Sequence, residues 1–219
     1  MAFAPERSRV PEKLDHASPE VARASLRDLA RINRYLGGYW VLRSVFAGLV
    51  KPQESFSVLD VGAASGDLGA KLRRLYPHVM VTSLDHRSVH LAQAAAPKLV
   101  ADAFRLPFRP ASFDFVFSSL FLHHFSNDDV VDLLTSFRSL ARRAVLAIDL
   151  DRGPLAYHFL PATRWLFRWH DITISDGQIS VQAGFKQAEL QTLAVQAGLG
   201  WAKVKTHRPW ARLSLVAPF

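Results

Sequence analysis

The sequence predicts an α/β fold in which helices cover both faces of a doubly wound, mostly parallel sheet. Short apolar runs alternate with amphipathic stretches along the chain, and strands that alternate with helices are typical of parallel sheets. A glycine-containing turn at Gly62 and Gly66 joins the first apolar run to the first amphipathic stretch. The length of 219 residues corresponds to one domain with an N-terminal extension. We expect strands near 57–61, 79–84, 98–101, 113–118 and 143–149, and helices near 67–75, 87–95 and 128–141.

The residues before the first strand divide into a tail and a helix pair. Residues 1–16 are polar, charged and interrupted by prolines, so we expect a disordered tail. Ser18 is a typical helix cap and Pro19 suits the first helical position. We expect residues 17–50 to form two helices that act as a lid over a ligand site. The alternative is that they form the interface of a homodimer.

The first strand and its turn predict a site for a nucleotide-like ligand. An acid, Asp60, ends the apolar run, and the small residues after it let the backbone approach a ligand. The helix that follows presents its N-terminus to the same place. A second acid, Asp85, ends the next apolar run, roughly 20 residues beyond the turn, where a ribose-binding carboxylate is expected. A dinucleotide-binding dehydrogenase is the alternative, although its usual Gly-x-Gly-x-x-Gly spacing is not present.

Four motifs in order resemble the class I S-adenosylmethionine-dependent methyltransferases. The turn 60–66 resembles the first motif of the family, acid-x-Gly-x-Gly-x-Gly, with Ala64 at the position of the middle glycine. Asp85 occupies the place of the ribose-binding acid, and Asp102 precedes a Leu-Pro-Phe turn as the family's adenine-contacting acid does. Residues 112–119 are similar to the fourth strand. The resemblance covers residues 56–150 well and 180–217 more loosely.

The resemblance implies a seven-stranded Rossmann-like sheet with an antiparallel last strand, within a methyltransferase domain at 51–219. It also implies S-adenosyl-L-methionine as the cofactor and S-adenosyl-L-homocysteine as its product. The residues expected to bind the cofactor are Asp60, Gly62, Ala63, Gly66, Asp85, His86, Asp102, Ala103, Ser118 and Ser119.

Two adjacent histidines after the fourth strand are the first candidates for a general base. Ligands bind beyond the carboxyl ends of the strands in such a sheet, and the imidazole pKa suits proton removal near neutral pH. His123 and His124 lie at this place, although they can instead line the cofactor pocket or bond the backbone. His170, beside Asp171, is a further candidate. No metal is expected, because the Asp-Asn pair of catechol-type methyltransferases is missing.

An aromatic- and arginine-rich insertion at about 151–185 is the expected specificity element. Its flat apolar side chains suit an aromatic or polyketide-like acceptor, and its arginines suit a carboxylate on that acceptor. The alternative is that the aromatic rings only build the core. The candidate substrate-binding residues are Arg152, Tyr157, His158, Arg164 and Trp165. The similarity to bacterial methyltransferases of quinone and polyketide pathways implies transfer to oxygen, or to an activated carbon, of a small and largely apolar acceptor.

Composition limits the possible partners and mechanisms of the protein. The formal net charge is +8, but the positive residues are scattered, so a nucleic-acid partner is not expected. An RNA methyltransferase and a non-catalytic cofactor-binding scaffold remain the alternatives. The absence of cysteine excludes disulfides, thiolate metal sites and a cysteine-nucleophile mechanism of pyrimidine methylation. No signal peptide and no apolar run of the roughly 20 residues that span a bilayer are recognised, so a cytoplasmic protein without membrane insertion is expected.

Overall fold

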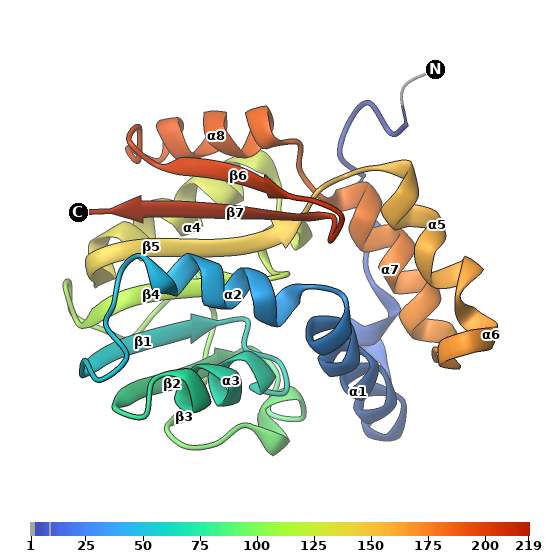
Figure 1. The fold of residues 1–219 in the computed structure, drawn as a ribbon, viewed down its shortest axis with the longest axis horizontal. Helices are drawn as coiled ribbons and strands as arrows, with labels where there is room; N and C mark the ends of the chain where they lie inside the picture. Colours follow the sequence, from blue (N-terminus) through green and yellow to red (C-terminus); the bar gives the residue numbers. More distant parts are fainter. Residues whose placement is uncertain (1–2, 9) are drawn as a thin grey trace.

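A seven-stranded sheet organises the chain. The computed structural model describes residues 3–8 and 10–219. The strands lie in the order β3-β2-β1-β4-β5-β7-β6 (Figure 1). Strands β1 to β5 pair in parallel, and β7 pairs antiparallel with both β5 and β6. This arrangement confirms the predicted doubly wound sheet with its antiparallel end. The strands are β1 (Phe56–Val61), β2 (Val79–Asp85), β3 (Lys98–Val100), β4 (Phe113–Ser119), β5 (Ala141–Leu150), β6 (Lys203–His207) and β7 (Arg212–Pro218).

Eight α-helices and three short 3₁₀ turns connect the described strands. They are α1 (Pro19–Tyr35), α2 (Gly38–Ala47), α3 (Asp67–Leu75), α4 (Asn127–Leu140), α5 (Pro154–Ala162), α6 (Arg164–Phe167), α7 (Asp171–Ala183) and α8 (Gln187–Gln196), with turns η1 (Lys13–His16), η2 (His90–Gln93) and η3 (Leu122–His124). Among the described residues, no helix combines the length and the hydrophobicity needed to cross a membrane.

The helix predicted near 87–95 is wrong, because the structure has only the 3₁₀ turn η2 there. The carboxylate of Asp85 accepts a hydrogen bond from the backbone N–H of Arg87 at 3.0 Å, which holds the start of the segment in a turn. Pro97 disfavours helical backbone at the residue before it. The two effects disfavour helical backbone at both ends of the segment, and only the turn over His90–Gln93 forms.

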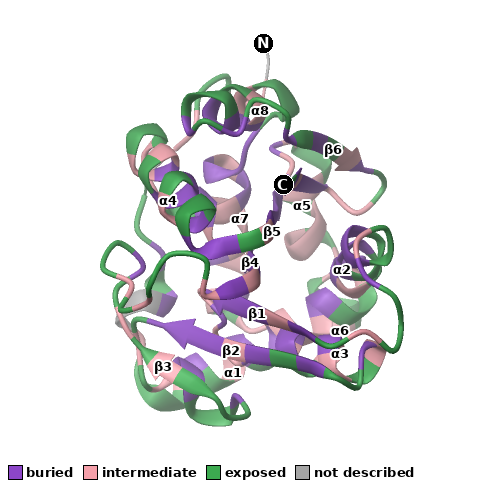
Figure 2. Cartoon of the chain, turned by 90° about the vertical axis from the view of Figure 1, so that its left-hand side faces the viewer, coloured by how far each residue is buried: buried purple, intermediate pink, exposed green. Residues whose placement is uncertain are grey.

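Two hydrophobic layers bury the central strands on both faces. Along β5, Val145 and Ala147 belong to the layer that α4 and α8 cover, whereas Leu146 and Ile148 belong to the layer under α2 and α3. This alternation follows from the two-residue period of a strand. Figure 2 shows the central strands as the buried middle of the molecule, with exposed positions on the outer sides of the helices. Strands buried on both faces read as nearly continuous apolar runs.

A helical cap lies beyond the carboxyl ends of the parallel strands. In Figure 1, α1, α5, α6 and α7 group at this edge, while α2 runs along the sheet. Gly177 lets α7 approach α5 closely, since a Cβ built there would lie 2.4 Å from Cδ1 of Leu160. Ligands of doubly wound sheets bind at the carboxyl edge. The cap therefore covers the place where a ligand is expected.

The N-terminal segment packs against the body of the protein, so the expectation of a disordered tail over residues 1–16 was wrong for the described part. We call residues 3–8 and 10–14 the N-terminal strap. Arg7 Nε donates to the carbonyl of Ala183 at 2.8 Å, and its guanidinium lies 3.9 Å from the ring centre of Phe185. The polar composition did not reveal these anchors, because they lie more than 170 residues away in sequence. Residues 1, 2 and 9 fall outside the described residues.

Candidate active site

A cavity of about 850 Å³ separates the carboxyl edge of the sheet from the helical cap. The loops after β1, β2 and β4 form one wall, and α1, α5, α7 and the N-terminal strap form the other. Its volume is in the range of small-molecule sites. Of the predicted lid, α1 lines the cavity through Leu26, Leu29, Ile32 and Asn33, and Leu36 lines it just after the helix, whereas no residue of α2 does.

The glycine turn between β1 and α3 brings backbone into contact with the cavity. Gly62 has φ +72°, and a Cβ there would lie 2.3 Å from Cδ2 of Phe121. Gly66 has φ +71° and caps α3 without lining the cavity itself. Ala64, at the position of the missing glycine, is also left-handed with φ 46°. A left-handed backbone costs alanine more than glycine, which explains why the motif usually has glycine here.

Asp85 is buried at the end of β2 and lines the cavity. Its Oδ2 accepts from the backbone N–H of Ala64 at 3.0 Å, so the second strand holds the glycine turn. His90 Nδ1 lies 3.2 Å from Oδ1, and the exposed His86 lies 3.4 Å from the same oxygen. Burial raises the pKa of Asp85, but hydrogen bonds from His90 and from the backbone of Arg87 and Ala64 outweigh it and lower the pKa. Asp85 is therefore a fixed anion. The sequence interpretation had missed His90.

Two buried acceptor oxygens at the cavity wall have no hydrogen-bond partner among the described residues. They are Oδ2 of Asp60 and Oδ1 of Asn33. Burial, and then the neighbouring Asp67, raise the pKa of Asp60 to about 7. Buried polar groups are nearly always hydrogen-bonded, so two open acceptors at this end of the cavity suit a ligand with N–H donors. An ammonium group, such as that of the amino acid moiety of S-adenosyl-L-methionine, fits this acidic end.

The remaining predicted cofactor residues lie at the same edge, with one exception. Asp102, Ala103 and Ser119 line the cavity. The carboxylate of Asp102 accepts from the backbone N–H of Phe104 at 2.9 Å and so shapes its own turn. Ser118 does not line the cavity, because strand register places it inside the sheet opposite Val61 and Ala147. Its prediction as a cofactor-binding side chain is corrected accordingly.

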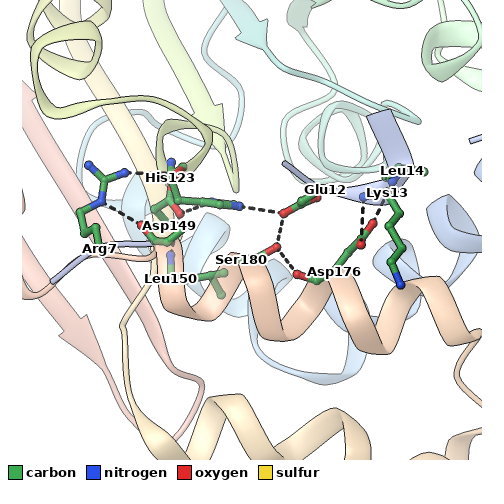
Figure 3. Close-up of polar contacts among 10 residues, drawn as sticks. Arg7, Glu12, Lys13, Leu14, His123, Asp149, Leu150, Asp176 and Ser180 are labelled. Carbon is green, nitrogen blue, oxygen red and sulfur yellow. Dashed lines mark hydrogen bonds and ion pairs between the residues drawn. The ribbon is translucent and has the colours of Figure 1, made fainter. Parts of the chain in front are cut away.

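His123 is the centre of a buried charge cluster (Figure 3). Its Nδ1 lies 2.7 Å from Asp149 Oδ1, and its Nε2 lies 3.5 Å from Glu12 Oε1. Burial lowers the pKa of His123, but the two carboxylates more than compensate and raise it to about 9. The ring is therefore an imidazolium at neutral pH, with both N–H groups directed at acids. A cation held in this way is poorly suited to remove a proton.

His124 lies on the cavity side of the cluster. Its ring stacks on His123 with centroids 4.3 Å apart, and it lines the cavity. Ligand atoms of Glu12, His123 and His124 all lie within 4.8 Å of one another, a spacing that a metal ion could bridge. However, the proton on His123 and its bond to Asp149 oppose metal binding, since a ligating imidazole must be neutral.

His170 does not reach the cavity. Its Nδ1 accepts from the backbone N–H of Ile172 at 3.3 Å, so the side chain caps α7. Asp171 forms an exposed ion pair with Arg164 at 2.7 Å instead of orienting the imidazole. The prediction of His170 as a base is not supported, because adjacent residues at a helix start point in different directions.

The predicted substrate residues lie on the wrong side of the insertion. Arg152 is 1% exposed and pairs with Glu189 at 2.6 Å, so it is unavailable to a ligand. Tyr157 and His158 do not line the cavity, and Arg164 and Trp165 lie at a separate outer depression with Arg168 and Trp169. One helix of the predicted insertion, α5, does line the cavity, but its cavity face is apolar. That face consists of Leu155, Ala156, Phe159 and Leu160.

Two further cavity residues were missed from the sequence. Glu12 belongs to a segment predicted to be disordered, and Arg212 stands alone before an apolar strand. An isolated arginine at the start of a buried strand is a detectable signal, since arginine is almost never fully buried unless paired. Glu12 has no such signal, because its partner His123 comes from a distant loop.

Known proteins resemble both the sequence and the fold. Residues 59–156 match the family described as a methyltransferase domain. A malonyl-[acyl-carrier protein] O-methyltransferase of Laribacter hongkongensis is 31% identical over 169 residues, which are 70% of this chain and 53% of the relative. The chain thus spans about half the length of that curated relative.

Solved structures share the fold at low sequence identity. A SAM-dependent methyltransferase from Aquifex aeolicus has a TM-score of 0.62 at 16% identity, covering 92% of this chain and 98% of that one. The plantazolicin methyltransferase BpumL in complex with SAH has a TM-score of 0.67 at 12% identity, covering 91% and 89%. Magnesium protoporphyrin IX methyltransferase from Synechocystis PCC 6803 with bound SAH has a TM-score of 0.56 at 18% identity, covering 83% of each chain.

Proposed function

We propose, since this chain belongs to the class I S-adenosylmethionine-dependent methyltransferases, that it transfers a methyl group to oxygen, or to an activated carbon, of a small and largely apolar acceptor. The observation that supports this proposal is that one cavity has a polar end and an apolar end. Acids and open backbone gather at β1 and β2, whereas apolar residues of α1, α5 and α7 dominate the opposite wall.

The acidic end is where this chain would hold the cofactor. Asp85 is a fixed carboxylate suited to ribose hydroxyls, and the open oxygens of Asp60 and Asn33 suit an ammonium group. Gly62, Ala63, Ser65 and the exposed Asp102 complete this wall. Bound S-adenosyl-L-methionine supplies an electrophilic methyl group on a sulfonium centre.

The residues around the apolar end position the acceptor and exclude water. Methyl transfer is a displacement, so alignment of the nucleophile supplies much of the rate. Leu29, Ile32, Phe159 and Trp210 provide an apolar wall. His124 is the residue we assign to remove a proton from an acceptor hydroxyl, because it lines the cavity while His123 already carries a proton.

The helical cap favours a small molecule rather than RNA as the acceptor. The net charge of +8 is the feature that favours RNA. However, α1, α5, α7 and the strap all line the cavity, so a polymer would have to enter beneath them. The relatives act on acceptors as different as malonyl-[acyl-carrier protein] and magnesium protoporphyrin IX, so they support no single acceptor.

The first test is calorimetric titration with S-adenosyl-L-methionine and S-adenosyl-L-homocysteine, with NAD as the control. Micromolar binding of both, and none of NAD, is the expected result. Phenols, quinones, aromatic acids and RNA would then be offered with radiolabelled cofactor. Binding of NAD alone contradicts the proposal. Methylation of RNA alone would replace the acceptor class, and cofactor binding without any methylated acceptor favours the scaffold alternative.

A further inference from the structure

Arg212 is a buried cation in the cavity wall that has no hydrogen-bond or ion-pair partner among the described residues. The residue is 5% exposed, stands at the start of β7 and lines the cavity beside Trp210 and Ala211. Its buried Nε has no hydrogen-bond acceptor. Across residues 3–8 and 10–219, its guanidinium takes part in no hydrogen bond and no ion pair. Burial lowers the pKa of Arg212 to about 10, which still leaves the group charged at neutral pH.

The other buried arginine shows what a structural role looks like. Arg152 donates to both carboxylate oxygens of Glu189 at 2.6 and 2.9 Å, and to the carbonyls of Ala4 and Gly184 at 2.8 and 2.7 Å. Taking a guanidinium out of water without such partners is costly. Arg212 is buried without such partners and lines a cavity, which indicates that its partner is a ligand.

The nearby acid Asp149 does not serve as that partner. It favours the charged form of Arg212 by electrostatic attraction. Its Oδ1, however, accepts from His123 at 2.7 Å and from the backbone N–H of Leu150 at 2.8 Å. The β5–β7 register pairs Arg212 with Leu150 and Asp149 with Leu213, so Arg212 and Asp149 belong to opposite faces of the sheet.

Sheet order places Arg212 far from the cofactor end. Asp85 ends β2, and β1, β4 and β5 lie between β2 and β7. Four strand spacings amount to about 19 Å. Arg212 therefore lies far from Asp85, the residue that we assign to the ribose of the cofactor. We place the partner of Arg212 on the acceptor, because the acidic end suits the ammonium group of the cofactor.

We propose that Arg212 binds a carboxylate of the acceptor, so that the acceptor is an apolar molecule bearing an acid group. This inference rests on the proposed function. A planar guanidinium can donate two parallel hydrogen bonds to a carboxylate. One positive charge balances one negative charge. A dianionic phosphate fits less well, because Glu12, Asp60, Asp67 and Asp85 also line the cavity.

The test compares Arg212→Met with Arg208→Met. Arg208 lies in the same hairpin and is exposed, and it does not line the cavity, so its variant controls for the loss of one charge. Thermal unfolding of the ligand-free proteins comes first. We expect Arg212→Met to melt at the same temperature as wild type or higher, since it removes an unpaired buried cation. A clear loss of stability relative to Arg208→Met would show a structural arginine and overturn the proposal.

Binding of matched probes follows, by calorimetry with and without saturating S-adenosyl-L-homocysteine. The probes are 4-hydroxybenzoate, 4-hydroxycinnamate and decanoate, each paired with its primary amide. We expect wild type and Arg208→Met to bind at least one acid about tenfold more tightly than its amide, and Arg212→Met to lose the preference. Arg212→Lys keeps the positive charge but lacks the planar guanidinium, so it should retain only part of the preference for the acid.

The outcomes separate the two proposals. No acid preference in wild type, or the same preference in Arg212→Met, overturns the role of Arg212. Failure of wild type to bind S-adenosyl-L-homocysteine contradicts the methyltransferase proposal instead. If S-adenosyl-L-homocysteine does not bind, the comparison of acids with amides in its absence still tests the role of Arg212.

Discussion

His123 Nδ1 lies 2.7 Å from Asp149 Oδ1, and this contact ties the loop after β4 to the end of β5. Glu12 faces the other ring nitrogen at 3.5 Å, and its carboxylate also accepts from the hydroxyl of Ser180 on α7. The cluster therefore joins the sheet, the cap and the N-terminal strap. Its charge state controls how these parts are held together.

Replacing His123 with Gln should remove a pH-dependent part of the stability. The folded pKa of about 9 lies above the ordinary value of 6.5. A raised histidine pKa stabilises the fold fully below about pH 6.5, and this contribution is lost as pH rises through about 9. We expect wild type to lose about 3 kcal/mol more than His123→Gln between these limits.

Urea unfolding, followed by circular dichroism from pH 6 to pH 10, measures this difference. Comparing the two proteins at each pH removes the contribution of the other titrating groups. Parallel stability curves for wild type and His123→Gln would contradict an imidazolium in this cluster.

Replacing His124 with Ala should slow turnover while leaving cofactor affinity nearly unchanged. General-base catalysis contributes about a hundredfold or more to the rate. His158→Ala is the matched control, because His158 is exposed and does not line the cavity. Steady-state rates with an acceptor from the panel, together with S-adenosyl-L-homocysteine titration, separate the two effects. A loss of thermal stability alone would favour a structural role for His124.

Replacing Asp85 with Ala should weaken cofactor binding by about 1.5–3 kcal/mol, roughly ten- to a hundredfold. The variant removes a charged acceptor for ribose hydroxyls and also frees the backbone N–H of Ala64. Calorimetric titration measures the affinity, and a melting curve checks that the turn still folds. Asp85→Asn keeps the shape and should fall between wild type and Asp85→Ala. Unchanged affinity in both variants would exclude the assigned role.

Replacement with Met should destabilise the protein much more at Arg152 than at Arg164. Removing Arg152 takes the guanidinium donor away from Glu189 and from several carbonyls, and breaking a buried pair costs about 3–5 kcal/mol. Arg164 forms only an exposed pair with Asp171, so its loss should cost less than about 1 kcal/mol. Chemical denaturation measures both free energies of unfolding. Equal effects would contradict the distinction between a buried anchor and a surface pair.

Metal removal should leave the protein unchanged. Both nitrogens of His123 face carboxylates, so the group formed by Glu12, His123 and His124 should prefer a proton to a metal ion. Dialysis against EDTA should alter neither the melting temperature nor the affinity for S-adenosyl-L-homocysteine. If zinc stabilised wild type but not His123→Gln, these three residues would form a metal site and the prediction would be wrong.

Local signals explain why the glycine turn and the two strand ends could be predicted. Asp60, Gly62, Gly66 and Asp85 stand at strand ends and turns, where backbone conformation and ligand chemistry restrict residue choice. The alternation of strands and helices predicted the sheet for the same reason. The helix predicted near 87–95 failed because a side chain, Asp85, captured the backbone of Arg87. Helix propensity does not include the competition between such a side-chain hydrogen bond and the helix.

The sequence by itself determined the alternation of strands and helices in the central sheet, the glycine turn and the acids at the ends of the first two strands. Those features depend on residues close together in the chain. Only the tertiary structure decided that His123 is an imidazolium, that Arg152 is an anchor and that Arg212 is a cation facing the cavity without a partner in the part of the chain that the structure describes. Burial and long-range contacts set the protonation and availability of these groups, since Glu12 and His123, or Arg152 and Glu189, meet only after the chain has folded.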